Sequence, residues 1–176
     1  MNQRAPILTV FGTRPEIIKL MPVLRALESD PGLRVIRLST GQQGDLAPPF
    51  LRGFALDIDE SLELMAANQS LNELLAKLIS AIDKVIERHR PAAVIVQGDT
   101  TSALAGALSA RFRAVPVIHI EAGLRTGDMD SPFPEESNRR LISQVSSLHL
   151  AATPGNVATL LGEGIAAANI ILTGNP

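Results

Sequence analysis

The 176 residues are enough for one α/β domain, and 45% hydrophobic residues can supply a full core. Aromatic residues make up only 3% and the formal net charge is −2, so few rings are available for base stacking and the charge balance argues against a nucleic-acid binder. The absence of cysteine excludes disulfides, a thiol nucleophile and cysteine-ligated zinc.

The sequence shows no signal for export. The opening residues MNQRAP lack the apolar stretch of a signal peptide, and no apolar run reaches roughly 18 residues, the length of a membrane span. We therefore expect a cytoplasmic protein with no membrane partner and no nucleic-acid partner.

Strand and helix signals alternate from the start of the chain. Residues 7–11 form a short apolar strand, and the Thr13-to-Glu16 spacing with a proline between predicts a capped helix start. Apolar residues at helical spacing then extend over 17–27. A second strand is predicted over 33–38, and a third, weak strand over 54–58.

The second half continues the alternation. Helices are expected over 71–88, 101–111, 136–145 and 153–161, and strands over 92–96, 115–120, 148–151 and 170–172. The Ala-rich composition of the 101–111 helix suits close packing on a sheet. Repeated strand–helix–strand units form a parallel sheet with right-handed crossovers. The prediction is an α/β fold: a Rossmann-like, doubly wound parallel sheet with helices on both faces.

The domain organisation follows from the same pattern. Residues 1–176 are expected to form a single Rossmann-like domain. The last residues, Thr173 to Pro176, form a turn signal directly after a strand, which is typical of a domain boundary inside a longer protein. No G-x-G-x-x-G motif is present, so nothing indicates a dinucleotide, and no cofactor is expected.

Polar residues gather where the predicted strands end. Open parallel sheets bind ligands at the carboxyl ends of their strands, where the strand order reverses. With the order 3-2-1-4-5, the segments after strands one, four and five bring Arg14, Asp99 and Glu121 to one place.

Two cations are candidates for binding an anionic ligand. Arg14 begins a helix whose free N–H groups, together with the guanidinium, suit a phosphate or carboxylate. Lys19 can reach the same anion. The structural alternatives are a surface Arg14 paired with Glu16, and an i,i+3 pair between Lys19 and Glu16.

Carboxylates supply the candidate chemistry. Asp99 lies at a strand-to-helix turn, where a helix N-cap is the alternative role. Glu121 follows a buried strand and needs partners, of which a structural salt bridge is the plain one. Glu135 and Arg139 share one helix face, and their alternative is an ordinary surface ion pair. His119 is expected to be a hydrogen-bonded core histidine, with an orienting role in the site as the lesser option.

Three carboxylates in one cleft repel one another. At least one pKa among Asp99, Glu121 and Glu135 should rise, which leaves an acid beside bases. This arrangement suits removal of a proton from carbon together with departure of an anionic group. The reaction needs no metal, and the histidine spacing suggests no metal site.

Four segments together carry a family resemblance. FGTRPEIIKL, QGDTTSALAGAL, HIEAGLRTGD and PFPEESNRRL resemble the non-hydrolysing UDP-N-acetylglucosamine 2-epimerases, and the resemblance extends over residues 7–176. It implies the N-terminal half of a GT-B-type two-domain architecture, with the C-terminal nucleotide-binding domain outside this chain. It also implies a cytoplasmic homodimer that supplies ManNAc units for bacterial surface polysaccharides.

The resemblance further implies an activity and roles for residues. The family interconverts UDP-GlcNAc and UDP-ManNAc by eliminating UDP to a 2-acetamidoglucal and adding it back. Asp99, Glu121, Glu135 and Arg139 would be catalytic, and Arg14 and Lys19 would bind the nucleotide sugar.

One position departs from the family pattern. Gln43, also assigned to substrate binding, replaces a common histidine, and Gly44 replaces the basic residue after it. The change is compatible with a variant substrate, such as a UDP-diacetamido-uronic acid. The sequence is also compatible with a GT-B glycosyltransferase, with a hydrolysing epimerase that releases ManNAc and UDP, and, for this half alone, with a weak binding module without activity.

Overall fold

A single parallel sheet organises the chain. The computed structural model describes residues 4–41 and 56–176, and its strands lie in the order β3-β2-β1-β4-β5-β6-β7. The strands are β1 (Ala5–Phe11), β2 (Leu33–Ser39), β3 (Glu60–Ser61), β4 (Ala93–Gln97), β5 (Val117–Ala122), β6 (Leu148–Ala151) and β7 (Ile170–Leu172). Every neighbouring pair is parallel, which confirms the doubly wound fold and the expected order.

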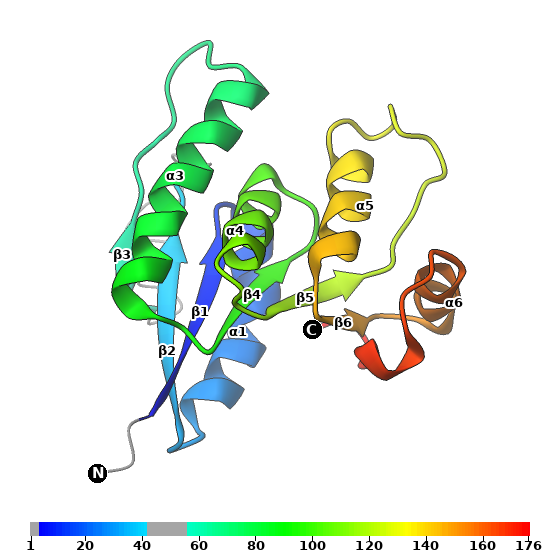
Figure 1. Cartoon of the computed structure of the whole chain (residues 1–176), viewed down its shortest axis with the longest axis horizontal. Helices are drawn as coiled ribbons and strands as arrows, with labels where there is room; N and C mark the ends of the chain where they lie inside the picture. Colours follow the sequence, from blue (N-terminus) through cyan, green and yellow to red (C-terminus); the bar gives the residue numbers. More distant parts are fainter. Residues whose placement is uncertain (1–3, 42–55) are drawn as a thin grey trace.

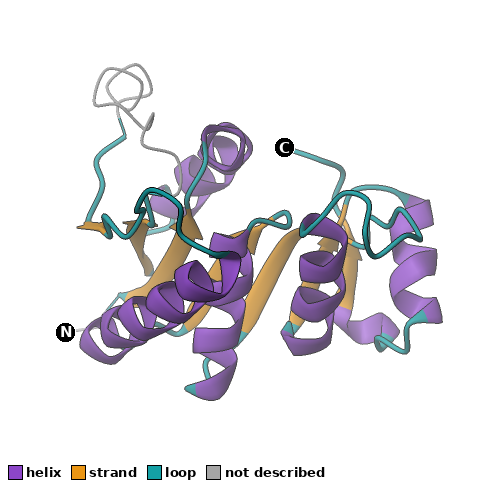
Figure 2. Ribbon diagram, turned by 90° about the horizontal axis from the view of Figure 1, so that it is seen from above, coloured by secondary structure: helices purple, strands orange, loops and turns teal. Residues whose placement is uncertain are grey.

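Helices cover both faces of this sheet. They are α1 (Arg14–Glu28), α3 (Leu71–His89), α4 (Thr101–Phe112), α5 (Glu135–Val145), α6 (Pro154–Gly162) and the 3₁₀ turn η1 (Ala167–Asn169). Figure 1 shows α3, α4 and α5 in front of the sheet and α1 behind it, and Figure 2 shows the same layers from above.

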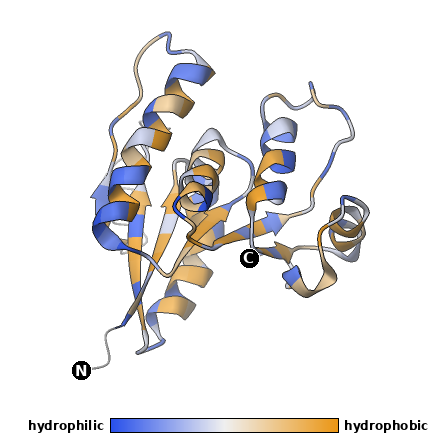
Figure 3. Ribbon diagram, viewed as in Figure 1, coloured by the Kyte–Doolittle hydropathy of each residue, from blue (hydrophilic) through white to orange (hydrophobic). Residues whose placement is uncertain are grey.

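Each face has its own apolar core. Residues of α3, α4 and α5 pack on one face, around Leu8, Val96 and Leu78, while α1 packs on the other face around Phe11 and Ile95. In Figure 3 the strands and the sheet-facing sides of the helices are mainly orange, with blue residues outside. Because strands buried on both faces need apolar side chains at consecutive positions, the strand runs are continuous rather than alternating.

Helix α4 lies unusually close to the sheet, as its alanine-rich sequence predicts. A β-carbon built on Gly106 would lie 3.0 Å from Val96 Cγ1 and 3.3 Å from Val10 Cβ. The helix buries residues around most of its circumference, including Ala103, Ala107 and Ala110. This close packing fixes the first turn of α4, which follows the candidate site residue Asp99.

Two of the predicted strands differ most from those observed. Residues 54 and 55 lie outside the described residues, and residues 56–58 are not in a strand; the third strand is the two-residue β3. β5 begins at Val117 instead of Val115, because Val115 N–H donates to Ala110 O in the turn that ends α4, where Ala114 has a φ of 56°. Pro116, which follows, has no N–H to donate to a neighbouring strand.

The helices differ from membrane spans in length or in composition. Over residues 4–41 and 56–176, none combines the length and the apolar character needed to cross a bilayer.

Candidate functional site

Three turns at the carboxyl ends of the strands form one pocket of about 240 Å³. The turns follow β1, β4 and β5, as expected where the strand order reverses. The pocket is lined by Thr13, Pro15, Glu16, Lys19, Gln97, Gly98, Asp99, Thr100 and Glu121. The structure thus brings Asp99, Glu121 and Lys19 together. Arg14 is exposed at the first residue of α1 and does not line this pocket.

A buried carboxylate joins two of these turns. Glu16 Oε2 accepts from Gly12 N (2.9 Å) and from the N–H and hydroxyl of Thr13 (2.7 Å each), while Oε1 accepts from Thr100 Oγ1 (2.8 Å). Burial raises the pKa of Glu16, and these hydrogen bonds act in the opposite direction. Glu16 therefore fixes the spacing between the turn after β1 and the turn after β4.

Lys19 pairs with Glu121, which corrects the alternative of an i,i+3 pair with Glu16. Its Nζ lies 2.8 and 2.7 Å from the two carboxylate oxygens of Glu121. Gln97 Nε2 donates to the same carboxylate, and Asn175 Nδ2 donates at 3.1 Å. The salt bridge anticipated as a structural alternative for Glu121 is therefore present, inside the pocket.

The backbone at Glu121 is strained. Its φ is 64°, and the pairing of β5 with β6 shifts register between Ile120 and Ala122. A non-glycine residue in the left-handed region costs roughly 1–3 kcal/mol and persists where the surroundings impose it, commonly at functional sites. Bulges of this kind turn a side chain away from the regular alternation of a strand.

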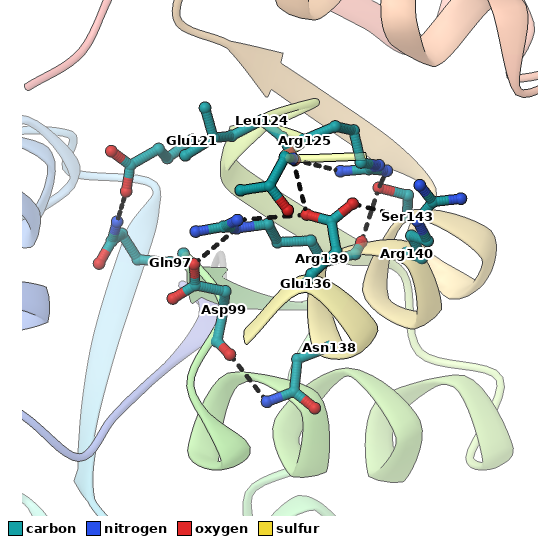
Figure 4. A network of polar contacts seen from close by, with 12 residues as sticks. Gln97, Asp99, Glu121, Leu124, Arg125, Glu136, Asn138, Arg139, Arg140 and Ser143 are labelled. Atoms are coloured by element: carbon teal, nitrogen blue, oxygen red, sulfur yellow. Dashed lines mark hydrogen bonds and ion pairs between the residues drawn. The ribbon is translucent and has the colours of Figure 1, made fainter. Parts of the chain in front are cut away.

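Asp99 contacts α5 through both its side chain and its backbone. Its Oδ2 accepts from Arg139 Nε at 2.7 Å, and its carbonyl accepts from Asn138 Nδ2 at 2.8 Å (Figure 4). The helix N-cap role proposed as an alternative is wrong, because Thr100 caps α4 by accepting from Ala103 N.

The expected rise of a carboxyl pKa is found at Asp99. Burial is the largest cause and raises the pKa, Arg139 lowers it, and the charges of Glu135 and Glu121 raise it. Repulsion among the three carboxylates thus contributes, but loss of water contributes more. The result is a carboxyl group that holds its proton more tightly than usual, next to an ion-paired carboxylate.

Arg139 has partners that the sequence interpretation did not anticipate. Instead of the surface pair with Glu135 that was the alternative to a catalytic role, it bridges Asp99 and the fully buried Glu136, whose Oε2 lies 3.2 Å from Arg139 Nη1. Glu135 begins α5 and is half-buried. Sequence reasoning missed Glu136, although its i,i+3 and i,i+4 spacing to Arg139 and Arg140 was a usable signal.

Two histidines are buried in the sheet. His119 Nε2 donates to Gly98 O at 2.7 Å, which supports the turn that carries Asp99, and its Nδ1 has no partner among the described residues. His149 lies between Ser143 O and Asn169 O, at 2.9 and 3.2 Å. His119 is thus the hydrogen-bonded core residue that was expected, and it contacts the site through the backbone.

We expect His119 to make the fold less stable in acid. Burial lowers its pKa from 6.5 to about 4, against the opposing effect of the Gly98 hydrogen bond. As the pH falls from 6.5 towards 4, the unfolded chain gains a proton that the folded chain refuses. The free energy of unfolding should therefore drop by about 1.4 kcal/mol per pH unit in this window.

Urea unfolding at pH 7 and pH 5 tests this expectation. Wild type and His119→Gln are compared, and the variant should lose about 2 kcal/mol less than wild type between the two pH values. Equal decreases in the free energy of unfolding would show that the pKa of His119 is not lowered in the folded protein.

Two further expectations concern substrate binding by Gln43 and the binding of metal ions. Gln43 and its neighbour Gly44 lie outside the described residues. For metal ions, residues 4–41 and 56–176 contain no group of three or more His, Asp or Glu side chains arranged to hold one.

Comparison with known proteins places the chain beside one family. The family model described as UDP-N-acetylglucosamine 2-epimerase matches residues 25–176. The chain is 43% identical over 169 residues to the UDP-N-acetylglucosamine 2-epimerase of Neisseria meningitidis, and 39% identical to that of Escherichia coli K12. Each alignment covers 96% of this chain and 45% of the relative, so the chain spans about half the length of the curated relatives it matches.

Solved structures agree with this assignment. The N. meningitidis UDP-GlcNAc 2-epimerase bound to UDP-GlcNAc matches with a TM-score of 0.93 and 42% identity, over 97% of this chain and 46% of that one. The Methanocaldococcus jannaschii enzyme in complex with UDP-GlcNAc and UDP matches with 0.89 and 36%, over 98% and 47%. MurG of Acinetobacter baumannii, at 16% identity and a TM-score of 0.67, shares the fold alone.

Proposed function

Because the chain belongs to the UDP-N-acetylglucosamine 2-epimerase family, we propose that it is the N-terminal domain of an enzyme that interconverts UDP-GlcNAc and UDP-ManNAc. In this proposal residues 1–176 form one Rossmann-like domain, and a second domain completes the cleft. The observation that carries it is one pocket with two carboxyl groups held by different cations: Asp99, which has a raised pKa and pairs with Arg139, and Glu121, which pairs with Lys19.

The reaction explains the need for both groups. The proton on C2 of the sugar is not acidic, because no carbonyl lies next to that carbon. Elimination avoids this barrier: the C1–O bond breaks with its electron pair leaving on UDP, a base takes the C2 proton, and a C1–C2 double bond forms. UDP then adds back to this 2-acetamidoglucal while an acid protonates C2 from the opposite face. The site must therefore supply a base, an acid and cations for the leaving diphosphate.

The residues of this chain divide these tasks. Asp99, Glu121 and Glu135 are the candidates for proton transfer, and Arg139 fixes the carboxylate of Asp99 through the 2.7 Å contact. Lys19, in the lining of the pocket, and Arg14, at the N-terminus of α1, are the candidates for binding the nucleotide diphosphate. Gln43 stays a prediction for substrate binding.

The biological setting belongs to the same proposal. We propose a cytoplasmic homodimer that uses no cofactor and supplies ManNAc units for polysaccharide biosynthesis. The two relatives whose structures hold UDP-GlcNAc support a nucleotide sugar as the ligand.

Proton NMR in D2O tests the activity. With the full-length protein and UDP-GlcNAc, we expect the H2 signal to disappear and an anomeric signal of UDP-ManNAc to grow. The isolated 176-residue chain, run alongside, is expected to be inactive because it holds only half of the cleft.

The same spectra separate the competing functions. Release of free ManNAc and UDP would indicate a hydrolysing epimerase, and turnover only with an added sugar acceptor would indicate a glycosyltransferase. If H2 of UDP-GlcNAc stays intact but H2 of a UDP-diacetamido-uronic acid exchanges with solvent, the second sugar is the substrate. Gln43 would then be the first position to examine.

A further inference from the structure

Glu136 is a fully buried carboxylate next to the proposed pocket and not part of its lining. Its Oε1 accepts from Arg140 Nε at 3.1 Å, and its Oε2 accepts from Thr126 N at 3.0 Å and from Arg139 Nη1 at 3.2 Å. Burial alone would raise its pKa, but these hydrogen bonds outweigh burial and lower the pKa to about 2. Glu136 is therefore a charged group at neutral pH.

Arg139 is held between two carboxylates. Its Nε contacts Asp99 and its Nη1 contacts Glu136, and the side chain is only 12% exposed (Figure 4). A guanidinium is planar and rigid, so fixing one of its nitrogens restricts the direction of the others. Glu136 thus determines where the Nε–H that meets Asp99 can point.

Glu136 also holds the loop between β5 and α5. The Thr126 N–H that it accepts belongs to this loop, and the Thr126 hydroxyl donates onward to Ser131 O at 2.7 Å. The contact between Glu136 and the Thr126 N–H allows an alternative, purely structural role, in which Glu136 only anchors the loop. The two roles differ in what happens to Asp99 when the charge of Glu136 is removed.

We propose that Glu136 is a positioning residue of the epimerase site: it holds Arg139 against Asp99, so that Asp99 is fixed for proton transfer. The proposal rests on the proposed function for its catalytic consequence. The contact itself is independent of the substrate, which allows the two to be tested apart.

The test is a titration of Asp99 by carbon-13 NMR in full-length protein labelled at the aspartate carboxyl carbon. The Asp99 signal is identified by its loss in Asp99→Asn. The charged groups facing Asp99 are Arg139 and Glu135 of α5 and Glu121 of β5. In Glu136→Gln, Arg139 loses its anchor and leaves Asp99, so the titration midpoint of Asp99 should rise by about one pH unit.

The opposite outcomes overturn the proposal. An unchanged midpoint would mean that Glu136 only anchors the loop. A lower midpoint would mean that Arg139 stays in place and that Glu136 merely repels Asp99. If Glu136→Gln does not fold, Glu136→Asp is titrated instead. This variant keeps the negative charge, but its shorter side chain places the carboxylate farther from Arg139, so the Asp99 midpoint should rise less. No rise would again overturn the proposal.

Arg140→Gln is the matched control. It removes the second guanidinium that contacts Glu136, and it leaves the contact between Glu136 and Arg139 intact. The Arg140 side chain is 41% exposed. The midpoint of Asp99 should therefore stay at the wild-type value; a rise as large as that of Glu136→Gln would overturn the specific role of Arg139.

Activity gives the second readout. In Glu136→Gln, kcat for UDP-GlcNAc should fall about 100-fold with little change in KM, because a group near the reaction is displaced while binding groups stay in place. If the Asp99 midpoint rises in Glu136→Gln but the wild type has no epimerase activity, the positioning of Arg139 by Glu136 is supported and the proposed function is wrong. An active wild type with an unchanged midpoint would do the reverse.

Discussion

Asp99→Asn is expected to lower kcat for epimerisation about 10³-fold or more while UDP-GlcNAc still binds. Asparagine has nearly the same shape, but it can neither give nor take the proton that the reaction moves. General acid or base catalysis typically contributes about 10²- to 10⁴-fold. Lys19 and the N-terminus of α1, the proposed diphosphate contacts, lie on another element and stay unchanged.

The measurement combines rates from proton NMR with affinity from calorimetry, both on full-length protein. Asp57→Asn is the control, since Asp57 is exposed and does not line the pocket. It removes the same charge and should leave both kcat and affinity at the wild-type values. A near-normal kcat in Asp99→Asn would refute the assignment of Asp99, and a loss of affinity as large as the loss of kcat would make Asp99 a binding residue.

The fold was predictable because its signals are local and repeated. Apolar runs separated by capped helices indicate a doubly wound sheet, and the order 3-2-1-4-5 is the usual one for that fold. The errors lie where local pattern carries little information. β3 consists of Glu60 and Ser61, two polar residues without strand periodicity, and the start of β5 is delayed by the left-handed turn at Ala114.

The site was predictable in its location but not in its pairing. The rule for strand ends brings Asp99 and Glu121 together. It does not reveal that Lys19 reaches Glu121, 102 residues away, since an i,i+3 contact with Glu16 is equally compatible with the sequence. Side-chain partners at this separation depend on how α1 docks on the sheet.

The neighbouring glutamates of α5 show the same limit. Adjacent residues on a helix point about 100° apart, so Glu135 and Glu136 cannot both point directly at the sheet. Only the docking of α5 decides that Glu136 is the buried one. The spacing to Arg139 and Arg140 favours Glu136, but on a charged helix such pairs are usually surface contacts.

The position of Gly123, directly after β5, accepts only glycine. Its φ is 87°, and a β-carbon added there would lie 2.4 Å from the carbonyl oxygen of Asn156 and 2.9 Å from its carbonyl carbon. Asn156 lies in the first turn of α6, so the obstacle is helix backbone rather than a flexible side chain. The approach of α6 to this turn, two residues after Glu121, therefore requires glycine.

Gly123→Ala should lower the free energy of unfolding of this chain by about 3 kcal/mol, from backbone strain and overpacking together. Gly127→Ala separates the two causes: Gly127 has a φ of 84° but nothing within 4 Å of an added β-carbon, so strain alone should cost about 1 kcal/mol. Urea unfolding at pH 7 measures both. Equal losses would mean that α6 moves away from Gly123 at no cost. The larger loss at Gly123 would mean that α6 holds the turn after Glu121 in place, and with it the strained backbone that directs this carboxylate into the pocket.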